Sequence, residues 1–579
     1  MRKGLLFFSD SYTYLLYYYR SIIVTRLYIF LLYYIAIKWY SSIMATRIIN
    51  PVLAGFYPDP SICEANGMYY LVCSSFSYVP GLPVFRSKNL VTWEQIGNVI
   101  DRPEQLDFTG AGVSRGLFAP TIRYNDGKFY CICTQVDKIG NFFVTADKPE
   151  GPWSNPIVIE GAEGIDPSLF FDDDGTAWYI GTRPAPEGPK YNGNWEIWIQ
   201  KIDLEKGKLI GESKGIWRGA LKNCVWPEGP HIYKINGRYY LIHAEGGTGP
   251  DHAVCVARCD TIDGEWQGKP SNPILTHRHM GSRAGIRNVG HADLVCADGK
   301  WWMCCLASRP YGDSGKRVCN MGRETFLVPV IWEDEWPLAS WETGRIENAY
   351  SLSGHVVSRD IDDADAVSFP AVDDFNTDSL ADYWISLRNR NPEYINCKEK
   401  SGVLRLYGGE AVTGEGNVSM VLRRQTGFSF EASTRADLHF NENEDAAGII
   451  CFQNEKFNYR LQLILKGKII VLQLVKAAGG DDEVLVEEVM TGGKKDVSMV
   501  LRVVAEHQKL RFEYGPDERN LSVLIDNIDA SILSTEAAGG FVGTVVGMFA
   551  VSGGDYKERK FYADFDWFRY ENSGREWTC

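Results

Sequence analysis

The sequence has little positive charge for its size. Its 579 residues hold 60 Lys and Arg against 74 Asp and Glu, which gives a net charge of -14 at neutral pH. Proteins that bind nucleic acid carry a basic footprint, so this balance argues against nucleic acid as a partner. The charge alone identifies no substrate.

The 14 cysteines lack the pattern of a metal centre. No CxxC pair and no Cys/His spacing of a zinc site appears. Cys131 and Cys133, like the adjacent pair Cys304 and Cys305, lie in strand-like runs where neighbouring residues face opposite ways. We interpret the cysteines as reduced, buried thiols that act as small hydrophobic side chains. So many scattered thiols favour a reducing compartment, and we predict a cytoplasmic protein.

The N-terminal region lacks an apolar run that is long enough to cross a membrane. Leu27 to Ile37 is uncharged and apolar for only 11 residues, whereas a spanning helix needs about 20. Met44 stands directly before a sequence that reads as a domain start. We predict that residues 1–43 are an upstream extension and that Met44 is the natural start. The alternative is a secretion signal or an anchor, which would make the protein exported or membrane-associated.

Helical periodicity is also scarce, and a strand pattern takes its place. The chain is too long for one core, and its residues 44–344 repeat a pair of strands five times. The second strand of each pair begins at a glycine, namely Gly67, Gly127, Gly175, Gly237 and Gly299. Glycine suits tight hairpins because it tolerates positive φ. Repeated four-stranded units predict an all-β fold, a five-bladed β-propeller; a twisted sandwich of similar hairpins is the alternative.

Acidic residues recur at one position of this repeat. Counting back 8 or 9 residues from the glycines gives Asp59, Ala119, Asp166, Glu228 and His291. In a propeller the first strand of each blade lines the channel, so these positions meet at one end of the axis. Burial and mutual repulsion raise carboxyl pKa values, which keeps one acid protonated while another stays ionised, as glycoside hydrolysis requires. The alternatives are a structural calcium site or simple strand ends.

Seven stretches of the first 344 residues carry a family resemblance. They are Gly55–Ser61, Ser74–Gly81, Ala119–Arg123, Gly164–Ser168, Trp226–His231, Gly290–Asp293 and Gly322–Leu327. In this order they resemble glycoside hydrolase family 43, in particular its β-xylosidases and α-L-arabinofuranosidases with an extra C-terminal β-sandwich. The resemblance implies an exo-acting, inverting enzyme that releases terminal β-D-xylose or α-L-arabinofuranose. Its substrates would be xylo-oligosaccharides or arabinose-substituted sugars; a non-catalytic sugar-binding propeller is the alternative.

The resemblance also implies roles for single residues. Asp59 would be the general base that activates water, Glu228 the general acid, and Asp166 the residue that raises the pKa of Glu228 and orients it. Inversion requires about 6.5–9.5 Å between the carboxyls of base and acid. No cofactor is expected for the chemistry. His291 matches a channel histidine that lies near calcium in some relatives; because calcium prefers oxygen ligands, its contact would run through water, and a plain hydrogen-bonded histidine is the alternative.

Four further residues are candidates for sugar binding. Arg309 matches a family arginine that bonds sugar hydroxyls, although the residue by itself is equally consistent with a surface ion pair. Phe56, Phe76 and Phe118 are expected to place aromatic faces against the sugar ring. Phe118 stands where many relatives have Trp, which keeps an aromatic wall but removes an N–H donor.

The remaining chain is predicted to form a second all-β domain. Residues 345–374 read as a linker, and residues 375–573 contain alternating runs such as Gly402–Tyr407 and Tyr459–Leu465, which predict a β-sandwich. Its position resembles the concanavalin-A-like domain of the family's xylosidases, which implies packing on the propeller and a loop at the pocket mouth. It holds no acid pair, so no second active site is expected; a carbohydrate-binding module is the alternative. A homo-oligomer is a further expectation.

Overall fold

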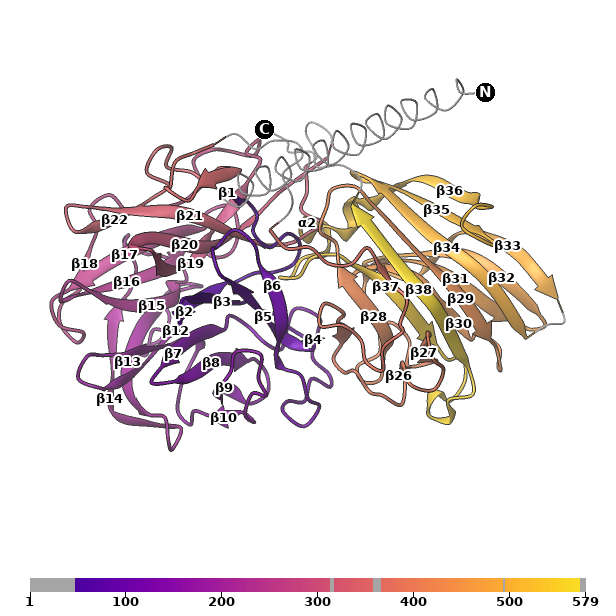
Figure 1. Ribbon diagram of the computed structural model, residues 1–579, viewed down its shortest axis with the longest axis horizontal. Coiled ribbons are helices and arrows are strands. Elements are labelled where there is room, and N and C mark those ends of the chain that lie inside the picture. The colour runs from indigo at the N-terminus through magenta and orange to yellow at the C-terminus, as the bar shows by residue number, and fades with distance from the viewer. Residues whose placement is uncertain (1–46, 313–316, 358–365, 493–494, 573–579) are drawn as a thin grey trace, which may run out of the picture.

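The computed structural model describes residues 47–312, 317–357, 366–492 and 495–572, most of them in β-strands. Figure 1 shows two lobes side by side, an N-terminal lobe in indigo to magenta and a C-terminal lobe in orange to yellow. The predicted extension of residues 1–43 lies outside the described residues. In the part that is described, no helix has the length and apolar character needed to cross a bilayer.

Five four-stranded antiparallel sheets make up the described N-terminal lobe. The first holds β2 (Ser61–Ala65), β3 (Met68–Val72), β5 (Gly81–Ser87) and β6 (Glu94–Ile100). The second holds β7 (Thr121–Asn125), β8 (Lys128–Gln135), β9 (Gly140–Ala146) and β10 (Ile157–Val158). The third holds β11 (Ile165–Phe171), β12 (Ala177–Pro184), β13 (Trp195–Asp203) and β14 (Lys208–Trp217). The fourth holds β15 (Glu228–Ile235), β16 (Arg238–Glu245), β17 (Ala253–Cys259) and β18 (Gln267–Gly268). The fifth holds β19 (Arg287–Ala297), β20 (Lys300–Ser308), β21 (Glu324–Glu333) and β22 (Trp336–Ala339).

The first strand of each sheet lies innermost. β2 contacts β7, β7 contacts β11, β11 contacts β15, β15 contacts β19, and β19 returns to β2, so the five strands close a ring. This is the arrangement of a β-propeller, and the predicted fold class is confirmed. β1 (Arg47–Ile49) pairs with β23 (Ala349–Ser351), which joins the two ends of the lobe although β23 lies within the predicted linker.

Two antiparallel sheets form the C-terminal lobe, as predicted for a sandwich. One holds β24 (Val372–Asp373), β26 (Ile395–Asn396), β27 (Leu404–Tyr407), β29 (Phe430–His439), β34 (Asp496–Glu506), β35 (Lys509–Gly515), β36 (Ser522–Asp529) and β38 (Tyr562–Asn572). The other holds β28 (Ser419–Arg424), β30 (Ala446–Asn454), β31 (Phe457–Lys466), β32 (Ile469–Ala478), β33 (Glu483–Gly492) and β37 (Val545–Val551). The short helices η1 (Ala530–Leu533), α2 (Thr535–Ala538) and η2 (Tyr556–Glu558) lie in the connections. Alternate side chains of the strands, among them Leu438, Leu461 and Phe565, point inward and form one apolar core.

The two lobes share buried apolar surface. β4 (Tyr78–Val79) of the propeller pairs with β25 (Ser386–Leu387) of the C-terminal lobe. One hydrophobic cluster contains side chains of both lobes, including Phe56, Phe76, Tyr78, Ile385, Leu387, Leu422 and Phe549. The C-terminal lobe is therefore fixed on the propeller by a strand pair and by a common core.

A close backbone approach fixes one loop of the C-terminal lobe in particular. A Cβ atom added to Gly322 of the propeller would lie only 2.9 Å from Cα of Gly543, so neither side accepts a larger residue. The backbone N–H of Phe541 donates to Oγ of Ser114 at 2.9 Å. The segment around Phe541 is thereby held against the propeller from two directions.

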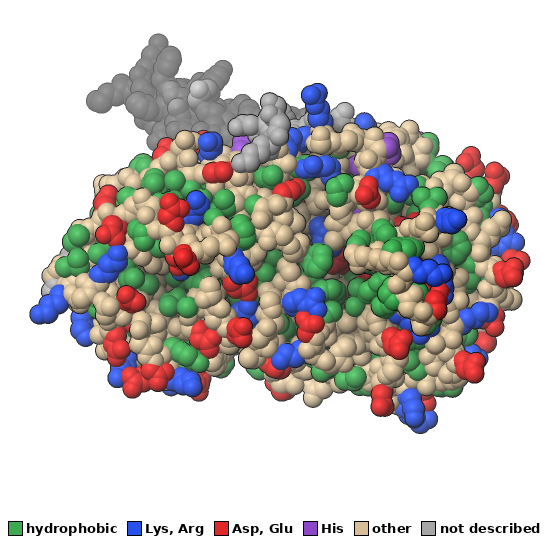
Figure 2. Space-filling view, turned by 180° about the vertical axis from the view of Figure 1, so that it is seen from behind, with side chains coloured by type: hydrophobic (Ala, Val, Ile, Leu, Met, Phe, Trp, Pro, Cys, Tyr) green, Lys and Arg blue, Asp and Glu red, His purple; other side chains and the backbone are tan. Residues whose placement is uncertain are grey.

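The cysteines and the surface charge agree with what the sequence predicts, namely buried thiols and no large basic surface. All 13 cysteines in the described ranges are free, and 12 of them are buried, Cys296 being the exposed one. The prediction of buried thiols is confirmed. Figure 2 shows acidic and basic side chains interspersed over the face that it presents, without a continuous basic field there.

Candidate active site

A small pocket of about 90 Å³ lies where the inner strands of the propeller begin. Its lining residues are Asp59, Phe76, Phe118, Ala119, Ile165, Asp166, Glu228, Thr248, His252, His291, Arg323 and Phe541. The five residues at the repeated sequence position are all among them. The repeat therefore delivers one side chain from each sheet to a single cavity.

Local backbone irregularities turn these side chains into the pocket. Asp59, Asp166 and His291 have φ values of 54°, 52° and 47°, a left-handed region that Asp tolerates better than most residues. The pairing register also shifts at the start of β11, β15 and β19. A bulge takes a residue out of the ladder and re-aims its side chain. The side chains of these strand starts consequently face the cavity instead of a neighbouring sheet.

Asp59 is held as a carboxylate. Its Oδ1 accepts from Nη1 of Arg323 at 2.7 Å, and its Oδ2 accepts from Oγ of Ser74 at 2.7 Å. Burial by itself would raise the pKa of Asp59, but Arg323, His291 and the Ser74 hydrogen bond outweigh it and hold the pKa below its ordinary value. This group is ionised at neutral pH.

Glu228 and Asp166 face the opposite situation. Burial, with the negative charges of Asp166 and Asp59, raises the pKa of Glu228 well above its ordinary value. Burial likewise raises the pKa of Asp166, although the nearby His291 and a hydrogen bond from the backbone N–H of Gly229 at 3.1 Å oppose the rise. The pocket thus combines an ionised carboxylate with a carboxylic acid that keeps its proton, which is the pairing required for acid–base work.

The arginine in the pocket is Arg323 and not Arg309. Nε and Nη2 of Arg309 donate to the two carboxylate oxygens of Glu324, both at 2.7 Å, and Arg309 is not among the lining residues. Arg323 and Glu324 are adjacent at the start of β21, so their side chains face opposite ways. Arg323 faces the pocket and Glu324 holds Arg309 behind it, which corrects the prediction for Arg309. Arg309 does form an ion pair, but a buried one and not the surface pair of the alternative.

Three phenylalanines form the aromatic wall. Phe76 and Phe118 lie edge to face with ring centroids 5.4 Å apart, and Phe541 stacks on Phe76 at 5.9 Å. Phe76 and Phe118 were both predicted, whereas Phe541 comes from the C-terminal lobe. Phe56 is fully buried, stacks on Phe76 from within the shared core and does not line the pocket. The prediction that Phe56 faces the sugar is therefore wrong.

Two polar residues of one loop were not predicted. Thr248 and His252 follow β16, and Thr248 receives a hydrogen bond from Nη1 of Arg323 at 3.1 Å. Nδ1 of His252 lies 3.0 Å from the backbone oxygen of Asn288, while its Nε2 has no partner among the described residues. Burial lowers the pKa of His252 to about 3, so the ring is neutral.

The described residues bring no set of direct metal ligands to His291, and a calcium ion that contacts it through water stays a prediction. In the described part of the chain, His291 belongs to no group of three His, Cys, Asp or Glu ligand atoms that could hold a metal. Two residues further on, Asp293 is completely buried, but its carboxylate is surrounded by donors instead of ligand oxygens. These donors are Nη1 and Nη2 of Arg123, Oγ of Ser61, the hydroxyl of Tyr233 and the N–H groups of Ile62 and Leu294. Calcium needs six to eight oxygens, and the Arg123 guanidinium already supplies the positive charge.

Comparison with known proteins identifies the family. The family model described as glycosyl hydrolases family 43 matches residues 48–337. The chain belongs to glycosyl hydrolase family 43. A second model, the beta xylosidase C-terminal concanavalin A-like domain, matches residues 372–571 of this family 43 chain. The sandwich is therefore the concanavalin-A-like domain that the sequence led us to expect.

Relatives of this family 43 chain match it over most of its length. It is 42% identical over 541 residues to a xylosidase/arabinosidase of Butyrivibrio fibrisolvens, covering 90% of this chain and 99% of the relative. It is 34% identical to a non-reducing end alpha-L-arabinofuranosidase of Bacteroides ovatus, covering 90% and 94% of the two chains. The crystal structure of a xylan beta-1,4-xylosidase from Bacillus halodurans matches with a TM-score of 0.81 and 31% identity, covering 91% of this chain and 100% of that one. The protein is a glycosidase.

Proposed function

We propose that this family 43 enzyme is an exo-acting, inverting glycosidase that releases terminal β-D-xylose or α-L-arabinofuranose. The observation that carries the proposal is the pairing of the ionised Asp59 with the protonated Glu228 in one small pocket. The sugar class follows from relatives that are named xylosidase/arabinosidase and alpha-L-arabinofuranosidase. Xylo-oligosaccharides and arabinose-substituted sugars are the proposed substrates.

In the proposed reaction Asp59 acts as the general base. Its carboxylate takes a proton from a water molecule, whose oxygen forms a bond to the anomeric carbon as the glycosidic C–O bond breaks. Glu228 gives its proton to the leaving oxygen, so charge and protons balance in a single displacement. No covalent sugar–enzyme intermediate forms, and the anomeric configuration inverts.

Asp166 acts on Glu228 and not on the sugar. Its negative charge is one of the causes that raise the pKa of Glu228, and it is fixed by the backbone N–H of Gly229, the residue directly after Glu228. We therefore assign to Asp166 the tuning and orientation of the acid. Arg323 bridges the base and the Thr248 hydroxyl, which suits it to hold a sugar hydroxyl next to Asp59.

The shape of the pocket supports exo action. The cavity is small, and Phe541 of the C-terminal lobe closes the aromatic wall against Phe76 and Phe118. We infer that a wall of this kind admits one terminal sugar and excludes an internal position of a long chain.

Proton NMR of the reaction tests the proposal. The purified enzyme is given nitrophenyl β-D-xyloside and nitrophenyl α-L-arabinofuranoside, and the first sugar anomer released is recorded before mutarotation. The inverted anomer is expected. A retained anomer would refute the single displacement. Absence of turnover on both glycosides and on xylobiose, combined with calorimetric binding of xylobiose, would favour the non-catalytic sugar-binding propeller instead.

A further inference from the structure

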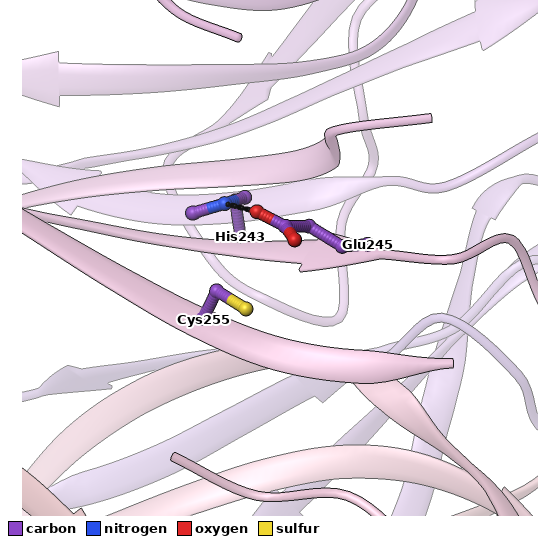
Figure 3. Close-up of side chains that lie close together, drawn as sticks. All are labelled: His243, Glu245 and Cys255. Carbon is purple, nitrogen blue, oxygen red and sulfur yellow. Dashed lines mark hydrogen bonds and ion pairs between the residues drawn. The ribbon is translucent and has the colours of Figure 1, made fainter. Parts of the chain in front are cut away.

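A cluster of metal-ligand side chains lies in the fourth propeller sheet, outside the pocket. His243 and Glu245 lie two residues apart on β16, and Cys255 on β17 is the direct cross-strand partner of His243. Residues i and i+2 share a face of a strand, and opposed residues have Cβ atoms about 5 Å apart. Figure 3 shows the three side chains pointing toward one another. Their ligand atoms all lie within 4.8 Å of each other.

A second cysteine borders this cluster from a loop. This cysteine is Cys224. Gly219 lies between the Cys224 thiol and the Glu245 carboxylate, since a Cβ atom added to it would lie 2.6 Å from Sγ of Cys224 and 3.4 Å from Oε1 of Glu245. The Cys224 thiol itself donates to the backbone oxygen of Val225 at 3.6 Å. The imidazole, the carboxylate and the Cys255 thiol therefore meet at one buried point, and the Cys224 thiol lies beside the carboxylate.

Burial makes the ionised carboxylate of Glu245 energetically unfavourable unless a cation lies beside it. His243, Glu245 and Cys255 are 0%, 4% and 2% exposed. The ion pairs of the described residues give Glu245 no Lys or Arg partner, only His243 with Nε2 at 2.9 Å from Oε1. The backbone N–H of Ala220 also donates to Oε1 of Glu245, but this donor carries no charge. A buried carboxylate is found paired with a cation or bound to a metal, so an imidazolium or a metal ion is still expected here.

The hydrogen bonds at His243 favour the metal. Nε2 is approached both by Oε1 of Glu245 at 2.9 Å and by the indole N–H of Trp217 at 3.0 Å. A proton on Nε2 satisfies Glu245 but opposes the Trp217 donor, while a lone pair accepts from Trp217 but opposes the carboxylate. Nδ1 meanwhile has no partner within the described residues, although it is buried. Protons on the imidazole cannot satisfy all of these contacts at once.

We propose that His243, Glu245, Cys255 and Cys224 bind a zinc ion. Zinc takes four ligands from Cys, His and carboxylates in closed structural sites, and thiolates select it over calcium and magnesium. Both thiols would lose their protons on binding, as zinc sites require. The Trp217 N–H then becomes an outer hydrogen-bond donor to the ligand set.

A groove open to solvent lies beside the proposed zinc site, and a bound ion would link two segments of the chain. An open groove lined in part by Trp217 and Gly219 lies beside the cluster and gives zinc a route in. Cys224 precedes Glu228 by four residues, and Glu245 precedes Thr248 by three. A zinc ion would therefore tie together the two chain segments that enter the pocket; its value for catalysis rests on the proposed function, but its binding does not.

Metal content and spectroscopy of the whole chain test the proposal without substrate. The protein is produced with zinc, freed of loose metal by dialysis against a weak chelator, and measured by inductively coupled plasma mass spectrometry. About one zinc per chain is expected. Cobalt exchanged into the site should show a thiolate-to-cobalt charge-transfer band, and zinc X-ray absorption should show sulfur at about 2.3 Å with nitrogen or oxygen at about 2.0–2.1 Å.

Matched cysteine variants locate the ion. Cys255→Ser should lower bound zinc at least about tenfold and remove the cobalt band. Cys259→Ser is the control, because Cys259 is also buried on β17 but donates to the backbone oxygen of Glu265; it should keep both signals. If Cys255→Ser does not fold, the cobalt band and the sulfur shell of the wild type still decide.

Three results would overturn the zinc site. Wild-type protein that carries almost no zinc and gives no cobalt band would leave His243 and Glu245 as a plain ion pair. Cys255→Ser protein with wild-type zinc would place the metal elsewhere. Equal losses in Cys255→Ser and Cys259→Ser would trace the loss to general damage. Because no sugar is involved, such failures leave the hydrolase proposal standing.

Discussion

Carboxyl groups of the C-terminal lobe and of the propeller pocket differ in the partners that they have. In the C-terminal lobe, Asp564 is 2% exposed and is held by Arg405 and Lys400, while Asp445 accepts three backbone N–H groups. In the propeller, the carboxyl of Glu228 accepts no hydrogen bond from the described residues and faces two other acids. Asp293 of the propeller, which is held by Arg123 and Ser61, resembles Asp564 and Asp445. The lack of partners among the described residues therefore marks Glu228 and not the whole lobe.

The largest difference in the effect of a substitution on kcat/KM is expected between Asp59 and Asp564. Asp59→Ala removes the proposed base, so kcat/KM should fall about 10³–10⁴-fold on xylobiose and on aryl glycosides alike. Asp564→Asn should leave both rates unchanged and lower the free energy of unfolding by about 1–2 kcal/mol, because its partners are partly exposed. Kinetics and chemical denaturation measure both. Wild-type rates in Asp59→Ala would end the assignment of the base.

Glu228→Ala should give the next largest effect, and one that depends on the leaving group. Loss of the proton donor should lower hydrolysis of xylobiose by about 10³-fold. Nitrophenyl glycosides need little protonation, so their loss should be much milder. A series of aryl glycosides with different leaving-group pKa values measures the slope, and an equal loss across the series would contradict the role of acid.

Asp166→Asn should shift the pH profile of kcat/KM. Asp59 must be ionised, so activity falls at low pH as its lowered pKa is crossed; Glu228 must be protonated, so activity falls at high pH as its raised pKa is crossed. Removing the negative charge of Asp166 lowers the pKa of Glu228. The high-pH limb should therefore move down by about one pH unit, whereas a merely structural Asp166 would lower the rate without moving the limb.

Phe541→Ala should give the smallest of these effects and test whether the C-terminal lobe contributes to the pocket. Loss of one aromatic wall should raise KM for the nitrophenyl xyloside by about tenfold, equivalent to about 1.4 kcal/mol. Val523→Ala on the exposed side of β36 is the control and should leave KM unchanged. Identical KM values in the two variants would confine substrate binding to the propeller.

The acids could be predicted because the repeat places them. Asp59, Asp166 and Glu228 occupy one position of a regular pattern, so their convergence follows from the propeller. Phe541 belongs to no such pattern, because it reaches the pocket from another domain. Arg323 lies inside a motif of the family, but the sequence does not show which of two adjacent side chains faces inward, and it predicts Arg309 in the place of Arg323.

The proposed zinc ligands could not be predicted from the sequence for a related reason. His243 and Glu245 are two residues apart and Cys255 pairs across a hairpin, whereas the familiar zinc spacings describe tight turns. Strand register, which the sequence leaves open, brings these side chains together. Phe56 is the opposite case. The sequence predicts it at the pocket, but its side chain packs in the core that joins the lobes.

That joint core has a consequence for dissecting the enzyme. The segments that match two families are separate in sequence, but β4 pairs with β25 and the same apolar cluster draws on both sides. Cutting the chain between the lobes would expose Tyr78 and its neighbours as a large apolar patch, which promotes aggregation. The propeller is therefore not expected to fold by itself. Exchanging or deleting the sandwich removes part of the core that both lobes share, and an engineered hybrid must keep the side chains of both lobes that form this core.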